Sequence, residues 1–347
     1  MTSPSPIYHL ALRDVHAAAG ADFVVLGGWS LPAAYGRGAP AEYEAIRTSA
    51  AVIDRSNRSR ILVTGTDALD VLKATFAGHV EDLEEGRAMR TARLDEHGAI
   101  QDVVLIARTG GIAYLVVGEP PQRADTVAAL RREIQADFQA QVEDRTESTC
   151  LIGIAGPNAA SVVGEHLADA LPARIQTLHC VTFQFHGFRG LAIRTSDTGE
   201  DGFEFMLAPA VAQHLIETLA PIAPLAGLQA TEIARVETAI PAFVPDLEPG
   251  LSPAEADLDV LLELAGGAEG RILAGLIVDG DPLPPGTPIS LGADGIGELR
   301  SCVRSPGLNA TIGLGIINSR VAFPGTQLLV GNTPATVVAK PFYRRRT

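Results

Sequence analysis

The stretch Thr198-Gly199-Glu200-Asp201-Gly202-Phe203-Glu204 carries the most unusual local pattern in this chain of 347 residues. Two glycines flank two carboxylates immediately before a run of apolar residues, which predicts a tight turn that enters a β-strand. Taken alone, such a turn is most simply explained as solvent-exposed. Glu204 argues against that interpretation, because it lies inside the predicted strand between Phe203 and Phe205. A carboxylate in that position faces either water or a polar ligand.

Short strands and helices are predicted on both sides of this turn. Strands are expected at Ala88–Leu94 and Asp102–Ala107, joined by a hairpin turn, and an amphipathic helix is expected at Gln122–Ala136. From Gly270 onward, short alternating strands with Gly and Pro turns predict a small all-β unit of about 75 residues. We therefore expect an α+β fold with three parts, at residues 1–147, 148–265 and 266–347.

Charge and composition restrict the classes of partner. The chain has 41 acidic and 27 basic side chains, a formal net charge of −14, which argues against nucleic acid as a partner. The histidines show no HxxxH or HxH spacing, so we predict no metal site. A hydrophobic content of 46% is enough to build sizeable cores.

The cysteines and the apolar runs bear on the cellular compartment. Cys150, Cys180 and Cys302 are far apart and odd in number, which is not the pattern of a disulfide framework. No apolar run approaches the roughly 20 residues that a membrane-spanning helix needs. No leader segment is recognisable either. We expect a cytoplasmic protein that does not associate with membranes.

Two further positions are candidates for chemistry, and each has a simpler explanation. Asp102 is the lone carboxylate at the start of an apolar strand, where it either ends the turn or faces a cationic amine in a cavity. Arg235, two residues before Glu237, lies on a largely apolar helix. It either forms a structural salt bridge or holds a carboxylate in bidentate fashion.

Several strings, taken together and in order, resemble the folate-binding aminomethyltransferase family, which comprises the T-protein of glycine cleavage and its relatives. The TGEDGxE motif of that family is matched almost letter for letter by residues 198–204. The other matches are Gly28-Trp29-Ser30-Leu31-Pro32 to its GWxLP turn, Gly156-Pro157 to its QGP strand end, Arg235-Val236-Glu237 to its RLE, and the strings at 297–315, 324–326 and 341–343 to its C-terminal barrel. The likeness covers nearly the whole chain.

The resemblance implies a fold, a cofactor and roles for individual residues. It implies two α+β units around a central hole that takes tetrahydrofolate, with a small C-terminal β-barrel. Asp102 would be the catalytic carboxylate near the reactive end of the folate, and Glu204 would hydrogen-bond the pterin. Arg235 would support the cofactor site. Trp29, Arg90 and Asp197 would lie on the substrate side.

Departures from the family pattern concentrate on the substrate side. The family usually has two adjacent aspartates where this chain has Asp102-Val103, so Asp102 is expected to be the only carboxylate available there. Tyrosines of the family are replaced by Arg90 and Asp197. The family's DVSHMG string becomes Asp54-Arg55-Ser56-Asn57-Arg58, and RLEAGL becomes the sequence of residues 235–240. These changes suit a paralogue with a different one-carbon donor.

The function expected from the sequence is a tetrahydrofolate-dependent aminomethyl or methyl transferase that acts on a small-molecule donor. We expect that donor to be polar and charged, or an Arg90–Asp197 pair to close the pocket, and we do not favour the H-protein of glycine cleavage as partner. Two alternatives stay open. One is a non-enzymatic folate-binding protein of the iron–sulfur assembly type, but residues 251–258 lack the cysteine of its KGCYxGQE string. The other is the same scaffold without folate, with a different acid–base reaction on Asp102.

Overall fold

The computed structural model describes residues 7–167, 171–247, 250–258 and 270–345. They form two compact units. The first unit comprises Met1–Arg93 and Asp102–Thr231, and the second comprises Leu94–Gln101 and Glu232–Thr347. The division into 1–147, 148–265 and 266–347 stays a prediction, and its second boundary lies outside the described residues.

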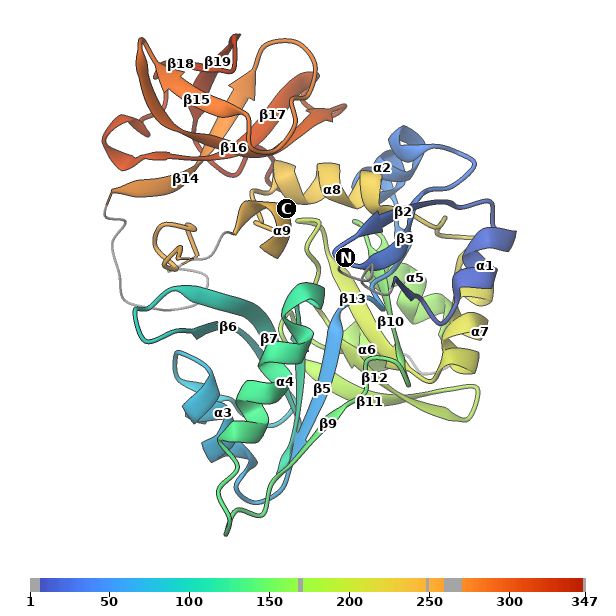
Figure 1. Ribbon diagram of the computed structural model, residues 1–347. Helices are drawn as coiled ribbons and strands as arrows, with labels where there is room; N and C mark the ends of the chain where they lie inside the picture. Colours follow the sequence, from blue (N-terminus) through green and yellow to red (C-terminus); the bar gives the residue numbers. More distant parts are fainter. Residues whose placement is uncertain (1–6, 168–170, 248–249, 259–269, 346–347) are drawn as a thin grey trace, which may run out of the picture. The chain divides into compact units, whose positions relative to one another are not determined.

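A five-stranded sheet has the strand order β6-β7-β8-β5-β9. Its strands are β5 (Ser59–Thr64), β6 (Ala88–Leu94), β7 (Ile100–Gly110), β8 (Ala113–Gly118) and β9 (Gln141–Asp144), and the helical segments around it are α3 (Ala68–Thr75), η1 (Val80–Asp82), η2 (Pro120–Gln122) and α4 (Arg123–Arg132). Helices α3 and α4 lie against this sheet (Figure 1). They bury Leu72 and Leu130 in one core with Val104 of β7. The predicted hairpin is present, and β7 is longer than predicted.

A second five-stranded sheet of the first unit has the order β11-β12-β13-β10-β4. Its strands are β4 (Ala51–Asp54), β10 (Cys150–Ala155), β11 (Cys180–Phe185), β12 (Phe188–Ile193) and β13 (Gly202–Leu207), and its helices are α5 (Ala159–His166), α6 (Leu171–Arg174) and α7 (Pro209–Leu219). Val163 of α5 and Leu215 of α7 pack with Phe203 and Phe205 of β13 in a single core. Helices therefore cover one face of this sheet as well.

The uncovered faces of the two sheets share a third core, and strand alternation decides which side chains reach it. Leu105 of β7 lies in that core with Leu151 and Ile193 of the second sheet. Because successive side chains point to opposite faces of a strand, Asp102 lies on the helix-covered face of β7. Glu204 lies on the face of β13 opposite to Phe203 and Phe205, which is the face between the sheets.

A small three-stranded sheet near the N-terminus has the order β1-β3-β2. It consists of β1 (Tyr8–His9), β2 (Asp22–Leu26) and β3 (Trp29–Ala34), and it is accompanied by α1 (Arg13–Ala18) and α2 (Ala39–Thr48). All six residues of β3 are buried. Trp29, a predicted substrate-side residue, is the first residue of this strand.

The second unit contains a closed barrel with the strand order β14-β17-β16-β15-β18-β19. Its strands are β14 (Arg271–Val278), β15 (Pro288–Leu291), β16 (Asp294–Ser305), β17 (Ala310–Asn318), β18 (Gln327–Val330) and β19 (Thr333–Val338). The helical segment η3 (Ser319–Val321) lies between β17 and β18, and α8 (Leu228–Glu237) and α9 (Phe243–Asp246) precede the barrel. Leu276, Ile289, Leu299 and Val337 fill its interior. The predicted α+β fold with a small C-terminal β-barrel is confirmed.

Among the described residues, no helix combines the length and the apolar character that crossing a membrane requires.

Candidate active site

The turn at residues 198–204 depends on its two glycines. Gly199 adopts a φ of +80°, in the left-handed region that favours glycine. At Gly202, a Cβ atom would lie 2.7 Å from the carbonyl oxygen of Ile154, so a side chain does not fit beside the neighbouring strand. The close approach of this turn to β10 therefore explains why the pattern contains glycine at its last position.

The carboxylates of the turn are buried and paired, so the simplest interpretation, a solvent-exposed turn, is wrong. Glu200 and Asp201 are only 7% and 8% exposed. Asp201 accepts hydrogen bonds from Nε of Arg194 at 2.9 Å and from Nη2 at 2.5 Å, a bidentate contact. Glu200 pairs with Nη1 of Arg47 at 3.1 Å. These two ion pairs hold the turn rigidly at the start of β13.

Glu204 is the carboxylate of this motif that keeps free acceptor capacity. Its residue is 4% exposed, and its Oε1 lies 2.9 Å from Nε of Arg55 in an ion pair. Apart from this ion pair with Arg55, no described residue donates a hydrogen bond to its oxygens. A buried carboxylate with open acceptor positions fits the amino–amide edge of a pterin, which offers two parallel N–H donors.

Asp197 is the centre of a cluster of arginines. Its Oδ1 accepts a hydrogen bond from Nη2 of Arg90 at 2.9 Å, and its Oδ2 contacts Nη2 of Arg58 at 3.0 Å and Nη2 of Arg55. Arg90 also donates to Oγ1 of Thr195 at 3.0 Å. The structure thus contains the Arg90–Asp197 pair that the sequence offered as one of two alternatives, and the closure of a pocket by this pair stays a prediction.

Charges within this cluster change the pKa of its central carboxyl. Burial raises the pKa of Asp197, but the guanidinium groups of Arg58, Arg55 and Arg90 outweigh burial and hold it well below its usual range. Burial likewise lowers the pKa of Arg58, yet Glu119 and Asp197 outweigh that effect and raise it. Both groups are thus charged at neutral pH. We call Arg55, Arg58, Arg90, Glu119, Asp197 and Glu204 the charged cluster.

Asp102 is completely buried on the face of β7 that helices α3 and α4 cover, opposite to the face between the two sheets. Its Oδ2 accepts a hydrogen bond from Oγ1 of Thr126 in α4 at 2.6 Å, and its Oδ1 accepts one from the backbone N–H of Glu119 at 3.3 Å. Burial raises the pKa of Asp102 to about 7, against the opposing effect of the Thr126 hydrogen bond. Among the described residues it forms no ion pair, so its link to the charged cluster runs through Glu119.

Glu119 corrects the expectation that Asp102 is the only carboxylate at this end. Its Oε1 accepts a hydrogen bond from Nη2 of Arg58 at 2.7 Å, while its backbone N–H holds Asp102. The absence of a second aspartate at Val103 is therefore accompanied by a glutamate next to β8. Sequence reasoning missed this residue because its proximity to Asp102 depends on the pairing of β7 with β8.

Trp29 belongs to a separate apolar cluster. Its ring stacks on that of Tyr8, with 5.2 Å between the ring centroids, and it packs with Leu10 and Leu31. The residue is 4% exposed. The contacts of the described residues do not connect Trp29 to the charged cluster, and its role on the substrate side stays a prediction.

Arg235 lies in the second unit, where all of its N–H groups have acceptors. Nε donates to Glu232 at 2.7 Å, Nη1 to the carbonyl oxygen of Ile240 at 3.2 Å and to Asp246, and Nη2 to Oγ of Ser301 at 2.8 Å and to Glu232. Burial lowers the pKa of Arg235, but Asp246 and Glu232 outweigh burial and raise it. These bonds tie α8, α9 and β16 together, which is a supporting role.

Arg55 and Arg58 are the other residues of the charged cluster that sequence reasoning missed. They occupy the positions at which the DVSHMG string has valine and methionine. Taken alone, these two substitutions indicate only that the motif is not kept. The signal was the joint change of these positions with two tyrosines, to Arg90 and Asp197. Four apolar or aromatic positions of the family become three arginines and one aspartate in this chain. The aspartate can pair with the arginines, so the four changes together indicate a group of interacting charges.

Comparisons with known proteins decide the family. Residues 12–266 match the family model described as the GCVT N-terminal domain, and residues 271–344 match the glycine cleavage T-protein C-terminal barrel domain. The chain belongs to the glycine cleavage T-protein family. Sequence and structure thus agree with the resemblance that the TGEDGxE motif indicates.

Relatives within the T-protein family match over nearly their full length. An aminomethyltransferase of Streptomyces avermitilis is 31% identical over 375 residues, covering 100% of both chains. One of Saccharopolyspora erythraea is 31% identical, covering 96% of this chain and 97% of the other. The crystal structure of the glycine cleavage system aminomethyltransferase T from Bartonella henselae superposes with a TM-score of 0.89 at 23% identity, over 98% of this chain and 99% of that one, which establishes the fold.

Proposed function

We propose that this chain is a one-carbon transferase that moves an aminomethyl or methyl group from a small charged donor to tetrahydrofolate. The observation that carries the proposal is Glu204, a buried carboxylate with open acceptor positions in a motif typical of the T-protein family. The relatives reported above are named aminomethyltransferases. That favours a transferase over both alternatives, the iron–sulfur assembly protein and the folate-free reaction.

The residues of the chain supply binding and charge for this reaction. Glu204 would hold the pterin of tetrahydrofolate, and Arg235 would support the cofactor site through the structure of its unit. Bound tetrahydrofolate supplies the nitrogen that accepts the one-carbon unit. Asp102 is the acidic residue on which turnover is proposed to depend: it is fully buried behind the backbone of Glu119, and its negative charge would stabilise a developing positive charge through the low-dielectric interior without contacting the ligand.

The charged cluster supports a polar donor. The side chains of Arg55, Arg58 and Arg90 are 16%, 20% and 18% exposed, and among the described residues their Nη1 groups have no hydrogen-bond acceptor. Partly buried guanidinium donors without acceptors favour a ligand that brings oxygen atoms, such as a carboxylate. We therefore propose that Arg90 and Asp197 select a small charged donor, with Trp29 on the substrate side, in a cytoplasmic enzyme.

Replacing Glu204 with glutamine is expected to weaken tetrahydrofolate binding by about 1–3 kcal/mol, or roughly 5- to 150-fold in Kd. The amide turns one acceptor into a donor and opposes an N–H of the pterin. Calorimetric titration with tetrahydrofolate measures the change. A variant that binds as tightly as the wild type would remove Glu204 from the cofactor site.

A matched control for this variant lies in the same turn. Glu200→Gln also removes a buried carboxylate charge, since Glu200 pairs with Arg47. We expect Glu200→Gln to lower stability without a comparable loss of tetrahydrofolate affinity. Urea unfolding of both variants separates a loss of folding from a loss of binding.

The H-protein of glycine cleavage is not the proposed donor carrier, and this is tested directly. Because Arg90 and Asp197 form an ion pair where the family has tyrosines, we expect negligible production of methylenetetrahydrofolate from aminomethylated H-protein. A T-protein with the family's tyrosines serves as the positive control. Production at an ordinary enzymatic rate by this chain would contradict the proposal of a small charged donor.

A further inference from the structure

Glu119 lies beside Asp102 but differs from it in access to ligand. It follows Gly118, the last residue of β8, and β8 neighbours β7 in the sheet. Its backbone N–H donates to Oδ1 of Asp102 at 3.3 Å. The side chain of Glu119 is 16% exposed, whereas Asp102 is fully buried with both oxygens hydrogen-bonded. Of these two carboxylates, Glu119 is the one that can meet a ligand without a rearrangement.

Arg58 joins Glu119 to the charged cluster, and its own position is fixed. Its Nη2 lies 2.7 Å from Oε1 of Glu119 and 3.0 Å from Oδ2 of Asp197. The buried Arg60 donates to the backbone carbonyl of Arg58, and to that of Ser56 at 3.2 Å. The loop that carries Arg58 is therefore held by hydrogen bonds to its backbone. Glu119 is in turn held from two directions, by Arg58 and by Asp102.

We propose that Glu119 is the acidic catalytic residue that meets the ligand in this enzyme and that Asp102 positions it through its backbone N–H. The inference rests on the proposed transfer to tetrahydrofolate. In methyl transfer, an N–C bond forms on the folate nitrogen, the bond between the carbon and the donor breaks, and the nitrogen loses its proton. In aminomethyl transfer that ends in methylenetetrahydrofolate, a second N–C bond then forms, the carbon–amine bond breaks, and the amine leaves as ammonia with the second folate N–H proton. The Glu119 carboxylate accepts the proton lost as the first N–C bond forms and passes it to the leaving group or to solvent.

The charges around Glu119 favour this role. Arg58 contacts its carboxylate from the loop between β4 and β5, and Asp102 lies behind its backbone on β7. Arg93 of β6 approaches the same corner, with its Nε 3.4 Å from Oγ1 of Thr126. Asp197 lies across Arg58. The direct contact with Arg58 holds the Glu119 carboxylate in place at the edge of the charged cluster.

The first test is Glu119→Gln in the full chain, assayed with tetrahydrofolate and a donor from a small-molecule screen. We expect kcat to fall by at least about tenfold, with tetrahydrofolate affinity preserved. Arg58→Met, which removes the group that holds Oε1 of Glu119, should lower kcat as well. Glu147→Gln is the control, because Glu147 pairs with Arg123 at 2.8 Å but is 65% exposed, and it should change neither quantity.

A second readout does not need the donor. Carboxyl NMR of protein labelled with carbon-13 aspartate follows the titration of Asp102, assigned with Asp102→Asn. Removing the like charge of Glu119 should move the Asp102 midpoint to lower pH. An unchanged midpoint, or a Glu119→Gln variant with wild-type kcat, would overturn the inference. Failure of the wild type to bind tetrahydrofolate would instead overturn the proposed function, since the NMR titration still reports on Glu119 and Asp102.

Discussion

Replacing Asp102 with asparagine is expected to lower kcat by roughly two orders of magnitude or more while tetrahydrofolate still binds. Asparagine keeps the shape of the side chain and can still accept the N–H of Glu119, so the fold should persist. It cannot carry the negative charge that the reaction requires. Steady-state kinetics with an identified donor measure the loss. An unchanged kcat would remove Asp102 from the mechanism.

A companion variant separates the charge of Asp102 from its packing. Thr126→Val is close in shape and removes the hydrogen bond from Oγ1 to Oδ2 of Asp102. That hydrogen bond lowers the pKa of Asp102, whereas burial raises it to about 7. Without the bond, the pKa should rise further, and the acid limb of the pH–rate profile should move to higher pH. A profile that does not move would mean that ionised Asp102 does not limit turnover.

The same carboxyl makes stability depend on pH, in a direction that can be worked out. Burial raises the pKa of Asp102 to about 7 in the folded state, so the folded chain retains a proton that the unfolded chain has already lost. Its contribution is present below the ordinary aspartate pKa and falls as pH rises towards 7. Relative to Asp102→Asn, wild-type stability should decrease by roughly 1.4 kcal/mol per pH unit in that window. Urea unfolding at several pH values measures this difference.

The sequence indicated the barrel and the TGEDG turn because both depend on local patterns. Alternating strands with Gly and Pro turns are a period-two signal, and strands β14 to β19 follow it. The close approach of β10 requires glycine at position 202. Because this glycine is part of the local motif, the turn can be predicted from the sequence without knowledge of β10. Local geometry of this kind depends on residues that are neighbours in the sequence, and it can therefore be predicted from them.

The charged cluster could be predicted only in part, because it joins residues far apart in the chain. The replacement of two family tyrosines by Arg90 and Asp197 predicts, as one alternative, that the two residues pair, and Nη2 of Arg90 lies 2.9 Å from Oδ1 of Asp197. Arg55 contacts Asp197, and Glu119 contacts Arg58, only after the strands are paired. No local sequence pattern therefore predicts these two contacts. The charges of Arg55 and Glu119 can be explained only from the structure, in which Arg55 contacts Asp197 directly and Glu119 contacts Arg58, a second partner of Asp197.

The position of Asp102 illustrates a different limit. Alternation along β7 places Asp102, Val104 and Ile106 on one face, and that much follows from the sequence. Which face the helix α4 covers is decided by tertiary packing, through contacts such as the hydrogen bond of Thr126 to Asp102. The role of Asp102 near the reactive end of the folate stays a prediction, and the proximity of Glu119 to it follows only from the pairing of β7 with β8.

Replacing Asp197 with asparagine is expected to lower the free energy of unfolding by about 3–5 kcal/mol, because it breaks a buried ion-pair network and leaves its positive charges unpaired. The side chain is 12% exposed, and it faces Arg55, Arg58 and Arg90. An amide has the same shape but neutralises none of them. Urea or thermal unfolding at neutral pH measures the cost.

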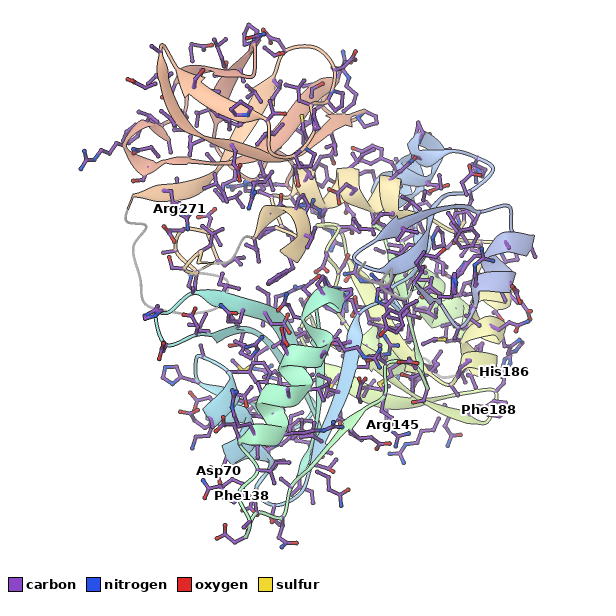
Figure 2. All side chains as sticks on the ribbon, in the orientation of Figure 1. Asp70, Phe138, Arg145, His186, Phe188 and Arg271 are labelled. Carbon is purple, nitrogen blue, oxygen red and sulfur yellow. The ribbon has the colours of Figure 1, made fainter. Side chains whose placement is uncertain are left out.

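Two controls decide whether this cost is electrostatic. Asp70→Asn removes an exposed aspartate, 59% accessible and 3.6 Å from Lys73, and should change stability by at most about 0.5 kcal/mol (Figure 2). The cost of Asp197→Asn should also shrink in acid, because the pKa of Asp197 is well below its usual range. Its contribution is present above the ordinary aspartate pKa and is lost as pH falls through the folded-state value.

A double-mutant cycle with Arg90 completes the argument. If Asp197 neutralises the arginines, Arg90→Gln should cost much less in the Asp197→Asn background than in the wild type, because it then removes one of the uncompensated charges. The two costs would be strongly non-additive. Additive costs, or a cost of Asp197→Asn no larger than that of Asp70→Asn, would show that the arginines do not depend on this carboxylate. In that case, the replacement of the family's tyrosine by Asp197 would need an explanation in the donor rather than in the stability of the chain.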